Sequence, residues 1–421
     1  MIREKGNGHI AAHDLSSGDE TSAHLKRFHA NRHAWLQALE DAGYQYDLLT
    51  TEQMAAGKLA DYRVLILPDS IALTDLETDT MRKFVEGGGL LLADAETALL
   101  NGHGRWQVAG RLDDVLGVQR VQVPSAGNQT PTVKFRVALS SSTPELEVAP
   151  ANPDLRLTTG HPSAGVGDAL FLIDNRYGSG RAITLNFWMN DYDEIRKTPA
   201  QAGWLSLLRD YMNLAGVRPV AEVRRSDGSM LACSEVIGFQ KEVAKFLAIL
   251  PDPGCADEGP ITLNVSETAY VFDLRAHRPL GRLNRITSKL VAGEPLLLAF
   301  LPAPVGRIKI AASGSQAGSP LFKPGDAVRL SVRLMPPNAP AGSSRAATAP
   351  PTALPPSAVH IGVRNPQGIL MDYYGANLPV VNGQAEFTLP LALNDVPGVW
   401  RVTVREPYAH QTASATLVVR K

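Results

Sequence analysis

Acidic side chains directly follow two apolar runs in the first half of the chain. Asp69 comes after the run at residues 64–67, and Asp94 and Glu96 come after the run at residues 90–93. Ligands of open α/β sheets bind beyond the carboxyl ends of the strands, so these positions are the first to inspect. Neighbouring carboxylates can act there as general acid and base, or hold a cation. Short acidic residues also cap helices that follow strands, and capping is the interpretation that we favour for Asp69 and Asp94.

Two further polar groups follow apolar runs in the same half of the chain. Trp188 and Asp191 come after a third run, at residues 182–187, and His103 and Arg105 lie in a glycine-rich loop after the second run. That loop could close over the strand ends. The candidate pocket predicted from the sequence comprises Asp69, Asp94, Glu96, His103 and Arg105.

The sequence lacks the glycine-flanked turn on which hydrolases and amidotransferases hold a nucleophilic Ser or Cys. Neither Ser70 nor the residues around Asp94 have flanking glycines, and neither cysteine follows a strand of this half. The glycine pairs at residues 6–8 and 178–180 are too short for a phosphate or dinucleotide loop, and the second is typical of a hairpin turn. We therefore assign no catalytic residue and expect no cofactor.

Histidines are concentrated near the start of the chain. Five of the ten fall within residues 1–33, and His29 and His33 have the i, i+4 spacing that can hold zinc on a helix. The glutamate of a metalloprotease signature is missing between them, and no clear carboxylate third ligand accompanies the pair. A solvated helix face is the interpretation that we favour, and we predict no metal site.

Cys233 and Cys255 are the only cysteines. They form no metal-binding spacing motif and lie in no small cysteine-dense domain, which favours two free thiols over a disulfide. Residues 1–14 carry several charges and no apolar core, so they do not resemble a secretory signal. We therefore expect a cytoplasmic protein with reduced cysteines.

The composition argues against two classes of protein. The 41 Lys and Arg residues nearly balance the 42 Asp and Glu residues, and a formal net charge of -1 argues against nucleic-acid binding. No stretch approaches the ~18 uninterrupted apolar residues that a membrane-spanning helix needs. A length of 421 residues and a hydrophobic fraction of 44% suit a globular protein of several domains.

Strand-length apolar runs alternate with amphipathic segments before residue 219. The runs at 64–67 and 90–93 are unbroken, as in strands buried on both faces, and residues 182–187 return to the same sheet. Thr74 and Glu77 form a capping box at the start of a helix that should end near Glu86. Two more helices are expected at residues 33–41 and 204–214. This alternation predicts a parallel sheet covered by helices on both faces.

Short strands separated by turns dominate after residue 219. Strands are expected at residues 261–265, 269–274, 295–301, 328–334, 360–363, 384–389 and 399–404. A helical segment is an option only around residues 242–250. Trp400 is the expected core anchor of the last unit, in preference to a ligand-stacking role.

These patterns divide the chain into four parts. Residues 1–33 come before the first predicted domain, and residues 34–219 should form an α/β domain. A small β-sandwich should occupy residues 220–304, and a second β-sandwich residues 323–421. A Pro-rich insertion at residues 336–356 should form an extended excursion from the second sandwich.

Six segments of the first domain form a recognisable combination, at residues 61–68, 73–75, 84–89, 93–94, 112–118 and 177–182. Together they resemble the trimerisation domain of family 42 β-galactosidases. The resemblance implies a flavodoxin-like fold similar to class I glutamine amidotransferases but without their nucleophile, and it implies self-association, as a trimer.

The β half extends this resemblance. Residues 270–275, 280–281 and 293–295 look like the small C-terminal β domain of such glycosidases, and residues 323–421 are similar to macroglobulin or immunoglobulin-like modules. The family's catalytic glutamates sit on an N-terminal barrel of roughly 250 residues, which residues 1–33 cannot supply, so no catalytic role is inherited. The resemblance implies that residues 1–33 are an N-terminal remnant or linker.

The resemblance therefore implies a non-catalytic oligomerisation and accessory portion of a β-galactosidase-like glycoside hydrolase, working in carbohydrate metabolism. Its expected partners are further copies of itself, a catalytic glycosidase barrel and carbohydrate, with neither nucleic acid nor a membrane. Two alternatives stay open. One is an independent small hydrolase or amidase using the pocket around Asp94, Glu96, His103 and Arg105, and the other is a carbohydrate-binding module.

Overall fold

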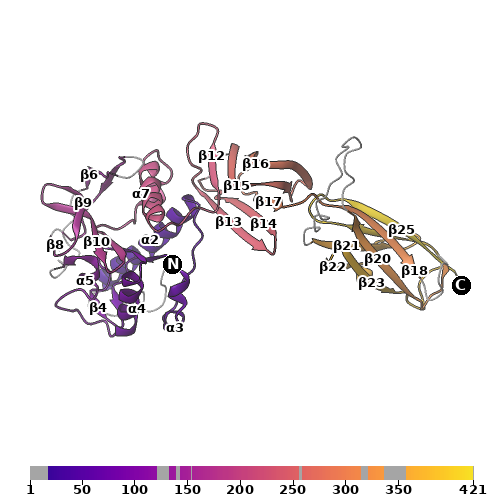
Figure 1. Ribbon diagram of the computed structural model, residues 1–421, viewed down its shortest axis with the longest axis horizontal. Helices are drawn as coiled ribbons and strands as arrows, with labels where there is room; N and C mark the ends of the chain where they lie inside the picture. Colours follow the sequence, from indigo (N-terminus) through magenta and orange to yellow (C-terminus); the bar gives the residue numbers. More distant parts are fainter. Residues whose placement is uncertain are drawn as a thin grey trace, which may run out of the picture. The chain divides into compact units, whose positions relative to one another are not determined.

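The computed structural model describes residues 18–120, 132–138, 143–152, 154–255, 258–313, 321–335 and 357–420. The chain divides into two compact units (Figure 1). The first comprises residues 1–236 and 251–258, and the second comprises residues 237–250 and 259–421. The expectations for residues 1–17 and for the Pro-rich insertion at 336–356 lie outside the described residues.

A five-stranded sheet organises the first unit, in the order β1-β3-β11-β10-β9. Its strands are β1 (Val64–Leu67), β3 (Leu90–Asp94), β9 (His161–Val166), β10 (Ala169–Tyr177) and β11 (Gly180–Leu185). β1, β3 and β11 pair in parallel, whereas β10 and β9 continue the sheet in antiparallel pairing. The predicted parallel sheet is thus confirmed for its first three strands and wrong for the other two, because the turn at Gly178 folds β10 back onto β11.

Both faces of this sheet are covered, as the unbroken apolar runs predicted. Successive residues of β1 point to opposite faces, so that Ile66 packs in one hydrophobic cluster and Leu67 in another. The first cluster contains residues of two helices, α2 (Gly18–Asp41) and α7 (Gln201–Leu214). The second contains residues of α4 (Asp75–Glu86).

Helix ends follow the predicted capping chemistry. Thr74 caps α4 in a capping box, in which the Glu77 N–H donates to Thr74 Oγ1 at 3.3 Å and the Thr74 N–H donates to Glu77 Oε2 at 2.8 Å. α2 begins at Gly18, well before the helix start expected at residue 33. The shorter helices are α3 (Thr51–Ala55), η1 (Lys58–Asp61), α5 (Asp113–Leu116) and α6 (Tyr192–Ile195). Among the described helices, none has the length and apolar character required to cross a membrane.

Short strands complete the first unit. They are β2 (Ala72–Leu73), β4 (Leu100–Asn101), β5 (Val118–Gln119), β6 (Val133–Arg136), β7 (Glu145–Val148), β8 (Arg156–Leu157) and β12 (Glu222–Arg225). β2 pairs with β4, β5 with β8, and β6 with β7. The β2–β4 pair lies just beyond the ends of β1 and β3, where the candidate pocket was predicted.

The β part of the chain continues with five longer strands. These are β13 (Ser234–Lys241), β14 (Ala244–Pro251), β15 (Gly259–Asp273), β16 (Arg278–Leu290) and β17 (Leu296–Leu301). β17 pairs antiparallel with both β14 and β15, and β16 pairs antiparallel with β15. The helical option at residues 242–250 is wrong, because pairing with β17 holds this apolar segment extended as β14.

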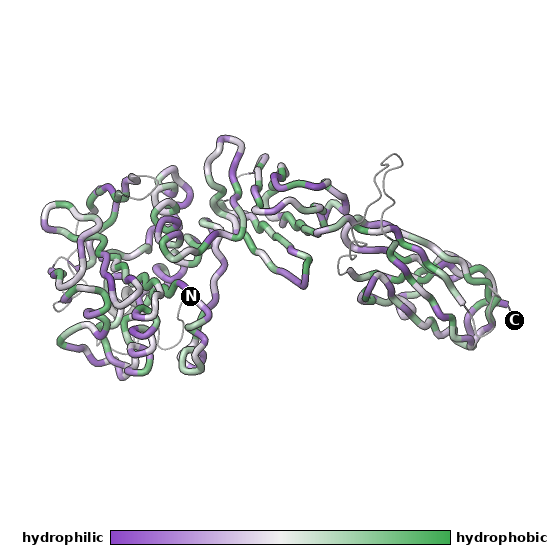
Figure 2. The backbone as a smooth tube through the Cα atoms, in the orientation of Figure 1, coloured by the Kyte–Doolittle hydropathy of each residue, from purple (hydrophilic) through white to green (hydrophobic). Residues whose placement is uncertain are grey.

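Two sheets at the C-terminal end share one hydrophobic core. One contains β18 (Arg307–Ser313), β20 (Ala327–Met335) and β23 (Gln384–Pro390). The other contains β19 (Leu321–Phe322), β21 (Ser357–Arg364), β22 (Ala376–Val380), β24 (Gly398–Arg405) and β25 (Thr412–Val419), and the short helix η2 (Asp372–Tyr374) precedes β22. The alternation of apolar and polar residues along these strands can be followed in Figure 2. Trp400 is fully buried among them and its Nε1 donates to the Val396 carbonyl oxygen at 3.0 Å, which confirms it as a core anchor.

Candidate functional site

Three predicted carboxylates meet at the carboxyl ends of β1 and β3. Asp69 follows β1, Asp94 ends β3, and Glu96 lies in the turn beyond it. The parallel pairing of the two strands brings their ends together, and the Asp69 N–H donates to Asp94 Oδ2 at 2.6 Å. All three residues are buried, with at most 5% of their surface exposed.

The capping role that we favoured for Asp69 and Asp94 is wrong. Thr74 caps α4, and the segment after Asp94 is a turn and not a helix. Asp94 instead accepts hydrogen bonds from the Asn31 side-chain amide at 2.6 Å and from Thr97 Oγ1 at 3.1 Å. The carboxylates therefore face one another and the side chains around them.

Helix α2 supplies the groups that fill the space beyond the strand ends. Its Arg27 forms an ion pair with Glu96 at 2.5 Å, and the same guanidinium lies 4.2 Å from the centre of the Trp188 ring. Asn31, one turn later, donates to Asp94 and accepts a hydrogen bond from the Met189 N–H at 2.7 Å. One helix face thus contacts the ends of β3 and β11 together.

A second buried arginine, Arg120, lies close enough to the cluster for its charge to act on Glu96. Arg120 is 2% exposed, and its side chain donates to the Thr97 carbonyl oxygen at 2.5 Å and, through Nε, to Asp113 Oδ1 at 2.7 Å. Its charge favours the ionised form of Glu96. The sequence analysis missed Arg27, Asn31 and Arg120. Of these, only Arg27 and Asn31 could have been found from the sequence, because their i, i+4 spacing places them on one face of a helix. That helix starts earlier than expected.

Burial dominates the electrostatics of the three carboxyl groups. It raises the pKa of Asp69, Asp94 and Glu96, and the negative charges of the neighbouring carboxylates raise the pKa of Asp94 and Glu96 further. The Arg27 charge opposes this increase at Asp69 and Glu96. Both carboxylate oxygens of Asp69 are buried and accept no hydrogen bond from the part of the chain that the structure describes.

Carboxyl groups with raised pKa values can serve as general acids. The structure brings no nucleophilic cysteine to the three carboxylates, because both cysteines lie elsewhere in a disulfide. Over the described ranges, no three His, Cys, Asp or Glu side chains are placed to hold a metal ion. The arrangement can share and hold protons, and its access to a substrate is limited by burial.

His103 and Arg105 lie apart from the three carboxylates. Both are exposed in the loop after β4, where their backbone N–H groups donate to Asn101 Oδ1 at 3.0 and 3.1 Å. Within the described segments, no hydrogen bond or ion pair joins either side chain to the cluster. His29 and His33 are also exposed, on the outer face of α2.

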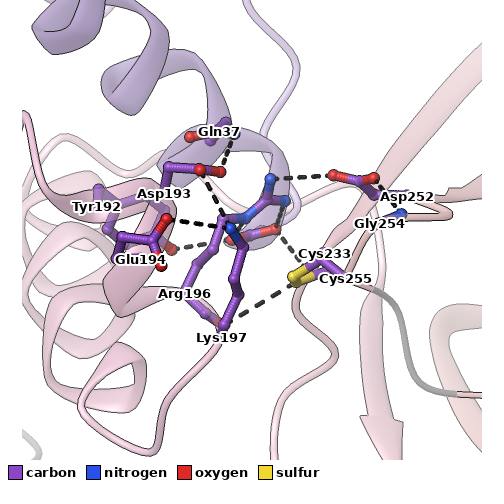
Figure 3. A network of polar contacts seen from close by, with 11 residues as sticks. Gln37, Tyr192, Asp193, Glu194, Arg196, Lys197, Cys233, Asp252, Gly254 and Cys255 are labelled. Atoms are coloured by element: carbon purple, nitrogen blue, oxygen red, sulfur yellow. Dashed lines mark hydrogen bonds and ion pairs between the residues drawn. A yellow bond between two sulfur atoms is a disulfide. The ribbon is translucent and has the colours of Figure 1, made fainter.

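A second buried polar network lies at the C-terminal end of α2 (Figure 3). Asp41 accepts hydrogen bonds from Arg196 Nη2 at 2.7 Å, from Arg196 Nε at 3.0 Å and from Tyr192 Oη at 3.0 Å. It also accepts the Cys233 N–H at 2.7 Å, and Arg196 reaches Asp252 at 3.3 Å. Every member of this network is partnered, which suits a structural role.

Cys233 and Cys255 form a disulfide beside this network. The expectation of two free thiols is therefore wrong. The chain returns to the first unit at residues 251–258, and this return places Cys255 next to Cys233 across 22 positions of sequence. No local spacing pattern in the sequence predicts that the chain returns to pair these two cysteines.

These observations define an N-terminal mixed α/β domain with a partly parallel sheet, followed by mostly antiparallel β sheets. Residues 13–196 match the family described as the β-galactosidase trimerisation domain. The resemblance seen in the sequence is confirmed: the chain carries a β-galactosidase trimerisation domain and further β domains after it.

Solved structures extend the similarity beyond that segment. A β-galactosidase from Bacillus circulans sp. alkalophilus is 15% identical, with a TM-score of 0.52 over 71% of this chain and 41% of that chain. A β-galactosidase from a Rahnella species is 13% identical (TM-score 0.46, 71% and 40% of the two chains). One from the haloarchaeon Halorubrum lacusprofundi is 16% identical (TM-score 0.40, 65% and 35%).

At 15% identity, the similarity to the Bacillus circulans enzyme shows a shared fold. This chain spans about 41% of the length of the Bacillus circulans enzyme. Comparison with curated proteins found no match.

Proposed function

We propose that this chain is the oligomerisation and accessory portion of a β-galactosidase-like glycoside hydrolase, without catalytic activity of its own. The match of residues 13–196 to the trimerisation domain supports self-association. In this proposal the first domain is flavodoxin-like and the β half forms two sandwiches. A catalytic glycosidase barrel and carbohydrate are the partners, and the chain serves carbohydrate metabolism.

The observation that carries the non-catalytic role is the filled edge of the sheet. α/β proteins of this kind bind ligands beyond the carboxyl ends of their strands. Here Arg27 and Asn31 of α2 occupy that place and bind the carboxylates of Glu96 and Asp94 directly. The cluster therefore binds α2 to the strand ends of the sheet through hydrogen bonds and an ion pair.

Size-exclusion chromatography with light scattering tests the self-association of the full chain. The proposal expects a mass of three chains that persists on dilution into the low micromolar range. A mass of one chain at the highest soluble concentration contradicts it.

A second candidate function, an independent hydrolase or amidase, is favoured by one observation. Burial gives Glu96 and Asp94 the raised pKa values that a general acid requires. A screen of glycoside, amide and ester substrates tests this alternative, with the variants Glu96→Gln and Asp94→Asn and the exposed His103→Ala as a matched control. Activity that falls in the first two variants and not in the control supports an enzyme, and a silent wild type supports the accessory role.

A third candidate, a carbohydrate-binding module, follows from the same family relation. Binding of the full chain to a glycan array tests it, and silence across galactosides and related glycans removes it. A cytoplasmic location also remains a proposal. The Cys233–Cys255 disulfide is an observation that favours an oxidising compartment instead.

A further inference from the structure

A cavity of about 320 Å³ lies in the first unit, away from the strand-end carboxylates. Helix α7 lines one side with Ser206, Arg209 and Asn213, whose spacing of three and four residues places them on one helix face. Arg224 of β12 and Tyr44, from the loop after α2, line the rest together with Arg218. The volume is that of a site for a small molecule.

Two polar atoms in the cavity wall are buried without a partner among the described residues. One is the Tyr44 hydroxyl, on a side chain that is 5% exposed, and the other is Arg209 Nε. Arg209 Nη2 donates to the Ala42 carbonyl oxygen at 3.2 Å, so the guanidinium is held in place while its Nε has no acceptor. Buried donors are nearly always satisfied, and an unsatisfied one costs stability unless a ligand or water accepts from it.

Positive charge predominates around these atoms. Burial lowers the pKa of the Arg209 guanidinium, and the nearby Arg224 charge acts in the same direction, whereas Tyr44 and Glu222 oppose it. Arg218 at the rim donates to Asn213 Oδ1 at 2.6 Å, which positions a third guanidinium. The lining contains three arginines and two carboxylates, those of Asp210 and Glu222.

We propose that this cavity binds a small molecule bearing an oxyanion, such as a phosphate, sulfate or carboxylate. An oxyanion accepts hydrogen bonds from guanidinium groups and hydroxyls, and Arg209 Nε and Tyr44 Oη offer both. Ser206 and Asn213 supply hydroxyl and amide groups for the rest of the molecule. This site is independent of the oligomeric and accessory role proposed above.

Isothermal titration calorimetry of the full chain with inorganic phosphate, sulfate and acetate tests the site and separates the three oxyanions. Glucose 6-phosphate and glucuronate, with glucose as the uncharged comparison, test whether hydroxyls add to the binding. We expect saturable binding of at least one oxyanion at one site per chain, and no binding of glucose at that site.

Two variants locate the binding. Tyr44→Phe removes only the unpartnered hydroxyl and retains the packed ring, and Arg224→Ala removes a guanidinium that the Arg209–Ala42 contact does not need. Each substitution should raise the dissociation constant at least about tenfold, because hydrogen bonds to charged groups are stronger than those between neutral groups. Arg282→Ala, on the exposed face of β16, is the matched control and should bind like the wild type. Absence of binding in the wild type, or equal binding in all variants, overturns the proposal.

Discussion

Asp69 combines a left-handed backbone with a buried carboxylate that accepts no hydrogen bond from the described chain. Its φ is 46°, a conformation that Asn adopts more readily than most residues. Burial raises the pKa of Asp69 and so opposes its ionised form, and the Arg27 charge offsets only part of this effect. We therefore expect Asp69 to lower the free energy of unfolding of this chain.

Replacing Asp69 by Asn should stabilise the protein. Asp69→Asn removes a buried charge that the Arg27 charge only partly offsets, and it keeps the shape and the backbone preference. We expect the free energy of unfolding at pH 7.5 to rise by about 1–2 kcal/mol, measured by urea denaturation. Asp94→Ala is the contrasting variant, and it should lose about 2–4 kcal/mol because it leaves the Asp69 N–H and the Asn31 amide without their acceptor. Destabilisation by Asp69→Asn would show that Asp69 is partnered in solution.

The raised pKa values predict how stability depends on pH. A carboxyl group whose pKa is raised in the folded state holds its proton after the unfolded chain has released it at about pH 4. The folded state then binds more protons, so the free energy of unfolding falls as pH rises from about 4 through the raised values. Urea denaturation between pH 5 and pH 8 measures this slope. Asp69→Asn should make it shallower, and a stability that increases over this range contradicts the assignment.

The candidate site was only partly predictable from the residues alone. Asp69, Asp94 and Glu96 could be placed together because each follows an unbroken apolar run, and parallel strands end at one edge. Arg27 could not be paired with Glu96, because the two are 69 positions apart and belong to elements that only the tertiary fold brings together. His103 and Arg105 were included because their loop follows β3 in the sequence. In the structure their backbone N–H groups bind Asn101 Oδ1, and both residues are exposed.

At the scale of elements, polar contacts hold α2 in the domain at its middle and at its C-terminal end. Asn31, near the middle of the helix, binds Asp94 and the Met189 N–H, and Asp41, its last residue, binds Arg196. Between them the helix packs its apolar residues, Trp35 and Leu39 among them, into the core. The helix therefore belongs to the domain over the whole stretch from Arg27 to Asp41.

Removing the Asn31 side chain tests the first of these contacts. Asn31→Ala leaves the buried Met189 N–H unpaired and takes one donor from Asp94, so it should cost about 2–3 kcal/mol of unfolding free energy. His33→Ala, on the exposed face of the same helix, is the control and should stay within about 0.5 kcal/mol of the wild type. Equal effects in the two variants would mean that the strand-end contacts add no stability.

The disulfide ties residues 251–258 to the first unit. Closing a loop of 22 positions should contribute about 3 kcal/mol, and Cys233→Ser with Cys255→Ser should lose that amount. Thermal unfolding with and without reductant measures it on the wild type, with the double variant as the control that reductant should leave unchanged. Labelling of both thiols in the unreduced, unfolded protein would contradict the disulfide.

Local pattern predicted most elements and missed those that depend on distant pairing. The strands at 64–67 and 90–93, and the capped helix after Thr74, were correct because their signals are contained within a few residues. β14 was open to a helical interpretation because its apolar content fits either period, and only pairing with β17 decides between them. The hairpin turn predicted at residues 178–180 is confirmed by the antiparallel pairing of β10 with β11, whereas the strands β9 and β10 themselves were not assigned from the sequence.

At the scale of the whole molecule, the chain combines a β-galactosidase trimerisation domain with further β domains. The fold similarity to the Bacillus circulans enzyme covers 71% of this chain, so it reaches well beyond residues 13–196. The strand-end edge of the first domain is filled by the chain's own helix. The assembly role that we propose accounts for both the filled edge and the family match.

The oligomeric state of the full chain is the most direct test of this account. Light scattering across a concentration series, with and without reductant, gives the mass in solution. The account predicts the mass of three chains, in unreduced protein, over the whole micromolar range. A mass of one chain at every concentration, from a sample that is folded by circular dichroism, contradicts it.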